Sequence, residues 1–158
     1  MPRVTVVSDN FNRADSADLG ASWDPYTGIT NLQIVSNVVR SGAIATIDAG
    51  ERNNTALDNN QWAQCRVVTI STSITGLIGV YLRLQAPNDF SGYLFNASGI
   101  GVSNAIRIYR IDASTFTVLS ESLDGVAAND VLRFEVIGSN LEGFVNDVSI
   151  LTATSGTY

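Results

Sequence analysis

Residues 131–151 read VLRFEVIGSNLEGFVNDVSIL, and this stretch decides the fold. In its first part, apolar and polar side chains take alternate positions, which is typical of a strand with one buried face. Two turn sequences interrupt the alternation. The first is a three-residue loop at 138–140, and the second is the tight turn Asn146-Asp147, whose residue types tolerate positive φ. The stretch therefore predicts three antiparallel strands joined by two hairpins.

Similar period-two segments recur along the chain roughly every ten residues, separated by Gly, Asn, Asp and Ser. They predict strands at 3–7, 32–35, 38–40, 43–47, 61–70, 77–85, 92–96, 105–111, 115–121, 131–137, 141–145 and 148–153. Helical periodicity and capping signals do not occur together over a dozen residues, and only Asp15 to Trp23 is predicted to hold a short helical turn. Many short strands without helices between them predict an all-β, two-sheet antiparallel β-sandwich of jelly-roll type. We expect it to span residues 1–158 as a single domain.

The composition argues against an enzyme. The chain has 158 residues with no His, and its nine basic residues are all Arg, so the usual near-neutral base and lysine chemistry are missing. The single cysteine, Cys65, lies in an apolar-rich run and is predicted to pack as a small buried side chain rather than react. Glycosidases on such folds use a Glu-x-Asp-x-x-Glu strand, which none of the four glutamates forms, although a pair from distant strands stays open.

Charge and the N-terminal sequence limit the partners. The net charge is −6 and the arginines are scattered, whereas a nucleic-acid-binding protein normally shows a basic stripe. Residues Met1-Pro2-Arg3-Val4 do not begin a signal peptide, and no apolar run approaches the ~18 residues of a membrane span. We therefore expect neither nucleic acid nor membrane as a partner. We also expect synthesis in the cytoplasm without a signal peptide, and a place in the virion if a phage encodes the chain.

The beginning of the chain carries a motif. It reads Asp9-Asn10-Phe11-Asn12-Arg13-Ala14-Asp15, followed by Leu19-Gly20 and Trp23. This resembles the opening of bacterial and phage-encoded concanavalin A-like (laminin G-like) jelly-roll domains, and the later hairpins are laid out similarly. The resemblance implies a concanavalin A-like jelly roll. It says little about function, because such domains are attached to lectins, glycosidases, adhesins and virion proteins.

The same motif crowds oxygen ligands together. Asp9, Asn12 and Asp15, with Asp18 close by, offer the carboxylate and amide oxygens that calcium prefers. One interpretation is a calcium site in a loop, and calcium is the one cofactor we consider. The other is that these side chains stabilise turns while Arg13 pairs with an aspartate.

Alternation on three predicted strands indicates a candidate sugar-binding face. The side chains that alternate with apolar neighbours are Tyr81, Arg83, Arg107, Tyr109, Arg133 and Glu135. If these strands share a sheet, the set forms one face that binds sugar by ring stacking and guanidinium hydrogen bonds. The other interpretation is a solvated face with Arg–Glu pairs across strands. Trp23 and Trp62 are expected to pack in the core or at an edge.

The last predicted strand is a poorly defended edge, because residues 149–154 carry no charge and no proline. Related domains add a further strand here, whereas this chain ends at Tyr158. We expect an assembly edge that packs against another protein subunit, made of Ser149, Ile150, Leu151, Thr152 and Tyr158.

These features predict a non-catalytic structural or interaction module. The main prediction is a bacteriophage virion protein that assembles onto a particle, such as a capsid decoration (cement) protein or an accessory head or tail protein. Its partners would be copies of itself or capsid and tail proteins. The alternative is a free-standing carbohydrate-binding module or lectin with a glycan as its partner, and a glycan hydrolase is a distant third.

Overall fold

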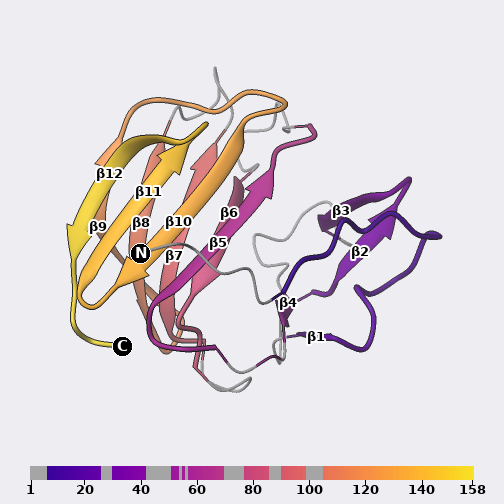
Figure 1. Ribbon diagram of the computed structural model, residues 1–158, viewed down its shortest axis with the longest axis horizontal. Helices are drawn as coiled ribbons and strands as arrows, with labels where there is room; N and C mark the ends of the chain where they lie inside the picture. The colour runs from indigo at the N-terminus through magenta and orange to yellow at the C-terminus, as the bar shows by residue number, and fades with distance from the viewer. Residues whose placement is uncertain are drawn as a thin grey trace. The chain divides into compact units, whose positions relative to one another are not determined.

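The computed structural model describes residues 7–25, 30–41, 51–53, 55, 57–69, 77–85, 90–98 and 105–158. These residues form twelve strands and no helix (Figure 1). Accordingly, the described part of the chain holds no helix long and apolar enough to cross a membrane. The chain divides into two compact units, residues 1–56 and 57–158, which are considered separately below. The single domain over residues 1–158 stays a prediction.

The first unit contains a hairpin of β2 (Leu32–Val35) and β3 (Val38–Ser41), as predicted. Its turn residues Ser36 and Asn37 have φ of 53° and 63°, the positive values that a two-residue type I′ turn requires. Two further strands, β1 (Trp23–Pro25) and β4 (Glu51–Asn53), pair with each other. These two strands were not predicted, because three residues are too few to show alternation.

The predicted helical turn between Asp15 and Trp23 is wrong, since the segment consists of bends and a turn. Side chains in this segment accept hydrogen bonds from backbone N–H groups that a helix would use for its own hydrogen bonds. Asp18 accepts a hydrogen bond from the Gly20 N–H at 2.9 Å, and Gly20 takes a φ of 91°. Such local side-chain bonds compete with helix formation. The predicted strands at 3–7 (apart from residue 7) and 43–47 lie outside the described residues.

The second unit is a sandwich of two four-stranded antiparallel sheets. Figure 1 shows one sheet in front of the other. The first sheet has the order β12-β11-β10-β5 and the second has the order β6-β7-β8-β9. The strands are β5 (Gln61–Arg66), β6 (Leu77–Leu82), β7 (Gly92–Ser98), β8 (Ile106–Asp112), β9 (Thr115–Ser122), β10 (Val131–Ile137), β11 (Asn140–Val145) and β12 (Val148–Thr154). The predicted all-β, two-sheet antiparallel sandwich is confirmed.

The core lies between the two sheets. Phe95 of β7 and Phe134 of β10 are fully buried, and their rings stack with centroids 5.8 Å apart. The Phe95 ring also occupies the space that a side chain at Gly143 would need, which explains the glycine in β11. Cys65 packs against this core as predicted, and burial raises the pKa of its thiol to about 11. The thiol is therefore protonated, and unreactive, at neutral pH.

Several strand boundaries differ from the prediction; β5, for example, ends at Arg66 rather than at residue 70, and two other differences have clear local reasons. β6 ends at Leu82 rather than at residue 85, because Arg83 takes a φ of 50° that breaks the extended backbone. The turn between β10 and β11 has two residues rather than three, since Asn140 already pairs with Ile137. The predicted turn at Asn146-Asp147 is present, and both residues have positive φ.

Candidate functional site

The outer face of the sheet β6-β7-β8-β9 brings together three of the predicted sugar-binding residues. Tyr81 on β6 lies opposite Leu94 on β7, which lies opposite Tyr109 on β8, and Tyr109 in turn lies opposite Val118 on β9. Residues directly opposite one another in an antiparallel sheet point to the same side. This side faces away from the core, because Phe95, which follows Leu94 on β7, points into the core, and successive side chains of a strand point to opposite sides. The four residues therefore form one row across all four strands.

Two phenylalanines complete an aromatic cluster on this face. The Phe90 ring lies 5.6 Å from that of Tyr81 and 6.0 Å from that of Phe116, and the Phe116 ring lies 5.7 Å from that of Tyr109. We call Tyr81, Phe90, Tyr109 and Phe116 the aromatic face. Phe116 is 45% exposed, whereas Leu94, on the same side of the sheet, is buried.

Neither phenylalanine was predicted to belong to this face. Phe116 and Val118 alternate with Thr115 and Thr117 in the predicted strand 115–121, and such an apolar row is typical of the buried side of a strand. Phe90 precedes β7 and belongs to no strand, so strand alternation could not place it.

A polar row borders the aromatic face. It contains Gly79, Asn96, Arg107 and Glu121, which lie opposite one another in turn. Arg107 forms an ion pair with Glu121, and this hydrogen bond raises the pKa of the guanidinium. Asn96 is 6% exposed, and its Oδ1 has no hydrogen-bond partner in the structure. Arg107 thus lies beside the aromatic face, as the sugar-binding interpretation requires. Arg107 also forms the cross-strand Arg–Glu pair that the alternative interpretation, a solvated face, predicts.

Arg83 does not belong to this face. Its side chain is buried and donates hydrogen bonds to three backbone carbonyls, those of Asn59 at 2.6 Å, Gly138 at 2.7 Å and Tyr158 at 2.6 Å. These carbonyls come from three segments that are distant in sequence. Arg83 therefore holds together the segment before β5, the β10–β11 turn and the C-terminus, which is a structural role.

Arg133 and Glu135 lie on the other sheet, so the condition of the sugar-binding interpretation, that the three strands share a sheet, is not met for them. Both are on the outer side of β10, where Arg133 is ion-paired with Glu135 and donates a hydrogen bond to Asp147 at 3.1 Å. The guanidinium carbon lies 3.7 Å from the centre of the Phe144 ring. Alternation shows which side of its own strand a residue takes, and it does not show which strands are neighbours.

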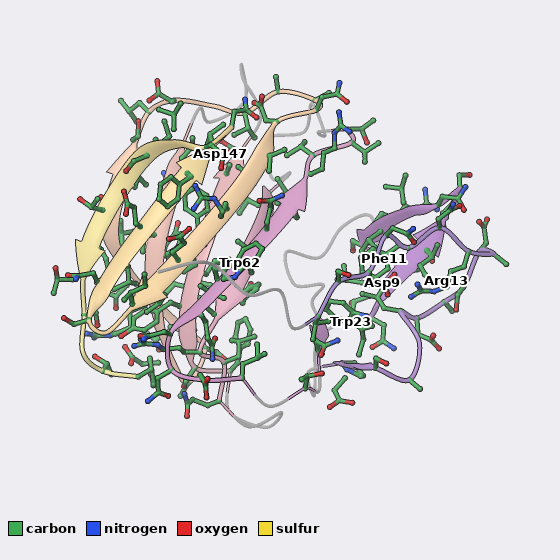
Figure 2. All side chains as sticks on the ribbon, viewed as in Figure 1. Asp9, Phe11, Arg13, Trp23, Trp62 and Asp147 are labelled. Carbon is green, nitrogen blue, oxygen red and sulfur yellow. The ribbon has the colours of Figure 1, made fainter. Side chains whose placement is uncertain are left out.

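Trp62 lies near this second group, on the edge strand β5 opposite Glu135 (Figure 2). Its position on an edge strand agrees with the prediction. Glu135 also lies opposite Glu142 on β11, which brings two glutamates together from separate strands. Because Glu135 is engaged by Arg133, this pair is not a free acid and base.

The opening motif forms a hydrogen-bonded cluster, with Asp9, Phe11, Arg13 and Trp23 gathered together in Figure 2. Asp9 accepts hydrogen bonds from Arg13 at 2.7 Å and 3.0 Å, from the Phe11 N–H at 2.8 Å and from the Trp23 indole at 3.4 Å. The pKa of Asp9 is lowered, mainly by the hydrogen bond from Arg13. The Phe11 and Trp23 rings lie 5.6 Å apart. The motif thus stabilises the local fold.

Two of the predicted calcium ligands, Asp9 and Asp15, have their carboxylates engaged in other contacts. Asp15 accepts the Ser36 N–H at 2.8 Å, and the Asn12 N–H donates to Asn10. Asp9 is already paired with a guanidinium, which opposes a cation at the same carboxylate. Among the residues that the structure describes, no group of three or more acidic, His or Cys side chains could hold a metal ion. The turn interpretation accounts for the observed contacts, and calcium stays a prediction.

The residues of the predicted assembly edge lie in two places, four of them on β12 and Tyr158 in the tail. β12 lies at the edge of its sheet, where Ser149 and Thr152 are exposed, Ile150 is half-buried and Leu151 is buried. Tyr158 is not free. Its hydroxyl donates to Asp112 at 2.6 Å and to the Ile111 carbonyl at 3.0 Å.

The Tyr158 ring also packs edge-on against the ring of Tyr93, with the centroids 5.5 Å apart. Tyr158 is thus docked on its own unit. Packing of the remaining edge against another subunit stays a prediction.

No protein-family model matches the sequence, and no curated protein is similar to it at a significant level. Among solved structures, the carbohydrate binding module CBM66 from Bacillus subtilis matches with a TM-score of 0.55 at 14% sequence identity. The match covers 64% of this chain and 62% of that chain, so this chain spans less than two thirds of that module's length. At this identity the likeness concerns the fold, and it agrees with a β-sandwich of the jelly-roll class. Membership of the family indicated by the opening motif stays a prediction.

Proposed function

We propose that this protein is a non-catalytic carbohydrate-binding module and that its aromatic face is the binding surface. The aromatic face carries this proposal. Four rings are in contact on one side of a sheet, and Phe116 leaves nearly half of its surface open to solvent. Aromatic rings stack on the C–H faces of sugar rings, while polar neighbours bind the hydroxyl groups. Arg107 and Glu121 lie beside the rings and provide donors and an acceptor.

The fold supports the same proposal. The solved structure with a similar sandwich is, by its name, a carbohydrate-binding module. The carbohydrate-binding alternative is therefore better supported than the main sequence-level prediction of a phage virion protein, for which neither the fold nor the comparisons offer support. The absence of enzyme activity stays a prediction.

Affinity electrophoresis or calorimetry with soluble polysaccharides tests the proposal. Tyr109→Ala and Phe116→Ala should each weaken binding about tenfold, which is about 1.4 kcal/mol. The matched control is Ile137→Ala, which removes a 55% exposed apolar side chain from the other sheet and should leave binding unchanged. Wild-type protein that binds no polysaccharide, or binding that survives both aromatic substitutions, would contradict the proposal. If Phe116→Ala instead abolished self-association seen by light scattering, the face would be a protein interface.

A further inference from the structure

We infer that the aromatic face takes an uncharged glycan and binds the interior of the glycan chain, laid across the strands, rather than a chain end. This inference rests on the proposed function and adds the substrate class. Two independent features carry it: the charge balance of the face and the direction of its row of rings.

The described strands place one cation and one anion on this face, and the two neutralise each other. Arg107 and Glu121 lie opposite each other on β8 and β9 and form an ion pair. Arg110, the other arginine of β8, lies on the opposite side of the strand and is paired with Asp112. A carboxylated or sulfated glycan would therefore find no unpaired guanidinium on these strands, and the chain carries a net charge of −6 that repels it. An uncharged glycan meets neither obstacle.

The row of side chains runs from one edge of the sheet to the other. Tyr81 is on the edge strand β6, Tyr109 is on β8, and Val118 is on the opposite edge strand β9. Because neighbouring strands lie 4.7–4.9 Å apart, Tyr81 and Tyr109 are separated by roughly 10 Å. A single sugar ring stacks on one of these side chains, whereas both are reached only by a longer chain. Stacking uses the faces of the sugar rings, and the interior of a glycan chain presents these faces as well as its ends do.

Calorimetry with glycans of different length and charge tests this inference. The probes are glucose and cello-oligosaccharides of increasing length, an uncharged β-glucan, xylan and mannan, and carboxylated polygalacturonate and alginate. We expect an uncharged polymer to bind at least about tenfold more tightly than its monosaccharide and than either carboxylated polymer. Blocking the reducing and non-reducing ends of the polymer should leave the affinity unchanged.

A matched pair of variants tests the charge argument. Glu121→Gln frees Arg107 from its partner and should raise affinity for polygalacturonate several-fold, while Arg107→Gln should not. Tyr81→Ala combined with Tyr109→Ala should remove most of the gain from chain length.

Equal affinity for a monosaccharide and a polymer, loss of binding after end-blocking, or a preference for the carboxylated polymers would overturn the inference and leave carbohydrate binding intact. No binding to any of these glycans, charged or uncharged, would instead count against the proposed function itself.

Discussion

The outer faces of the two sheets in the second unit carry similar residue types, but they differ in how much aromatic surface is exposed to solvent. On β6-β7-β8-β9, rings contact rings, and Phe116 is 45% exposed. On β12-β11-β10-β5, the Phe144 ring is covered by the guanidinium of Arg133, which is 4% exposed and held by Glu135 and Asp147. Phe116, which packs beside other rings, keeps part of its surface exposed to solvent, whereas Phe144, which packs under a paired arginine, is buried. The first arrangement suits binding, and the second suits stability. We call the outer face of β6-β7-β8-β9 the open face and the outer face of β12-β11-β10-β5 the closed face.

The largest effect is expected from a substitution on the closed face. Arg133→Ala leaves Glu135, whose side chain is 11% exposed, without its cation, so the free energy of unfolding should fall by about 3–5 kcal/mol. The control is Arg107→Ala on the open face, where the ion pair is solvent-accessible and the loss should stay under about 1 kcal/mol. Urea denaturation of both variants measures the difference. Equal losses would mean that the two faces do not differ in the way described.

Arg83 was predicted to lie with Tyr81 on the open face, and its contacts are structural instead. Arg83→Met removes charge-assisted hydrogen bonds to three carbonyls and should lower the free energy of unfolding by about 2–3 kcal/mol. Glycan affinity per folded molecule should not change. Deletion of residues 155–158 should also destabilise the protein, because Tyr158 provides one of these carbonyls. A deletion variant as stable as the wild type would show that the docked tail contributes nothing.

On the open face, Phe116→Ala should separate binding from stability. We expect glycan affinity to fall about tenfold, about 1.4 kcal/mol, while the melting temperature shifts by only a few degrees because the ring is half exposed. Thermal unfolding and calorimetry on the same sample measure both. A large fall in melting temperature with unchanged affinity would assign Phe116 a packing role.

The smallest expected effect concerns pH. The pKa of Asp9 is lowered by Arg13, and that of Asp112 is lowered mainly by the Tyr158 hydroxyl and then by Arg110. A carboxyl with a lowered folded pKa stabilises the protein above its ordinary pKa of about 3.9, and this contribution is lost as the pH falls through the folded value. Stability should therefore be level from pH 7 to pH 5 and decline below about pH 4.

Urea titrations across this range check the expected decline. Asp112→Asn should make this decline shallower, because it removes one of the two carboxyls with a lowered pKa. An unchanged slope in Asp112→Asn would remove Asp112 from the explanation.

The sequence by itself determined most of the strands, their two sides and most of their turns. Alternation placed Tyr81 and Tyr109 away from the core on their own strands, and Asn146-Asp147 marked its hairpin through residues that tolerate positive φ. These features are local, because side-chain period and turn geometry depend on a few consecutive residues.

Only the tertiary structure decided which strands are neighbours. It placed Arg133 on the opposite sheet, brought Phe90 from outside the strands into the aromatic face, and turned Arg83 away through a positive φ. Strand order depends on pairing between distant segments, and identical alternation is compatible with many orders. The binding face is assembled by that long-range pairing, which is why its members could be recognised singly in the sequence and their grouping could not.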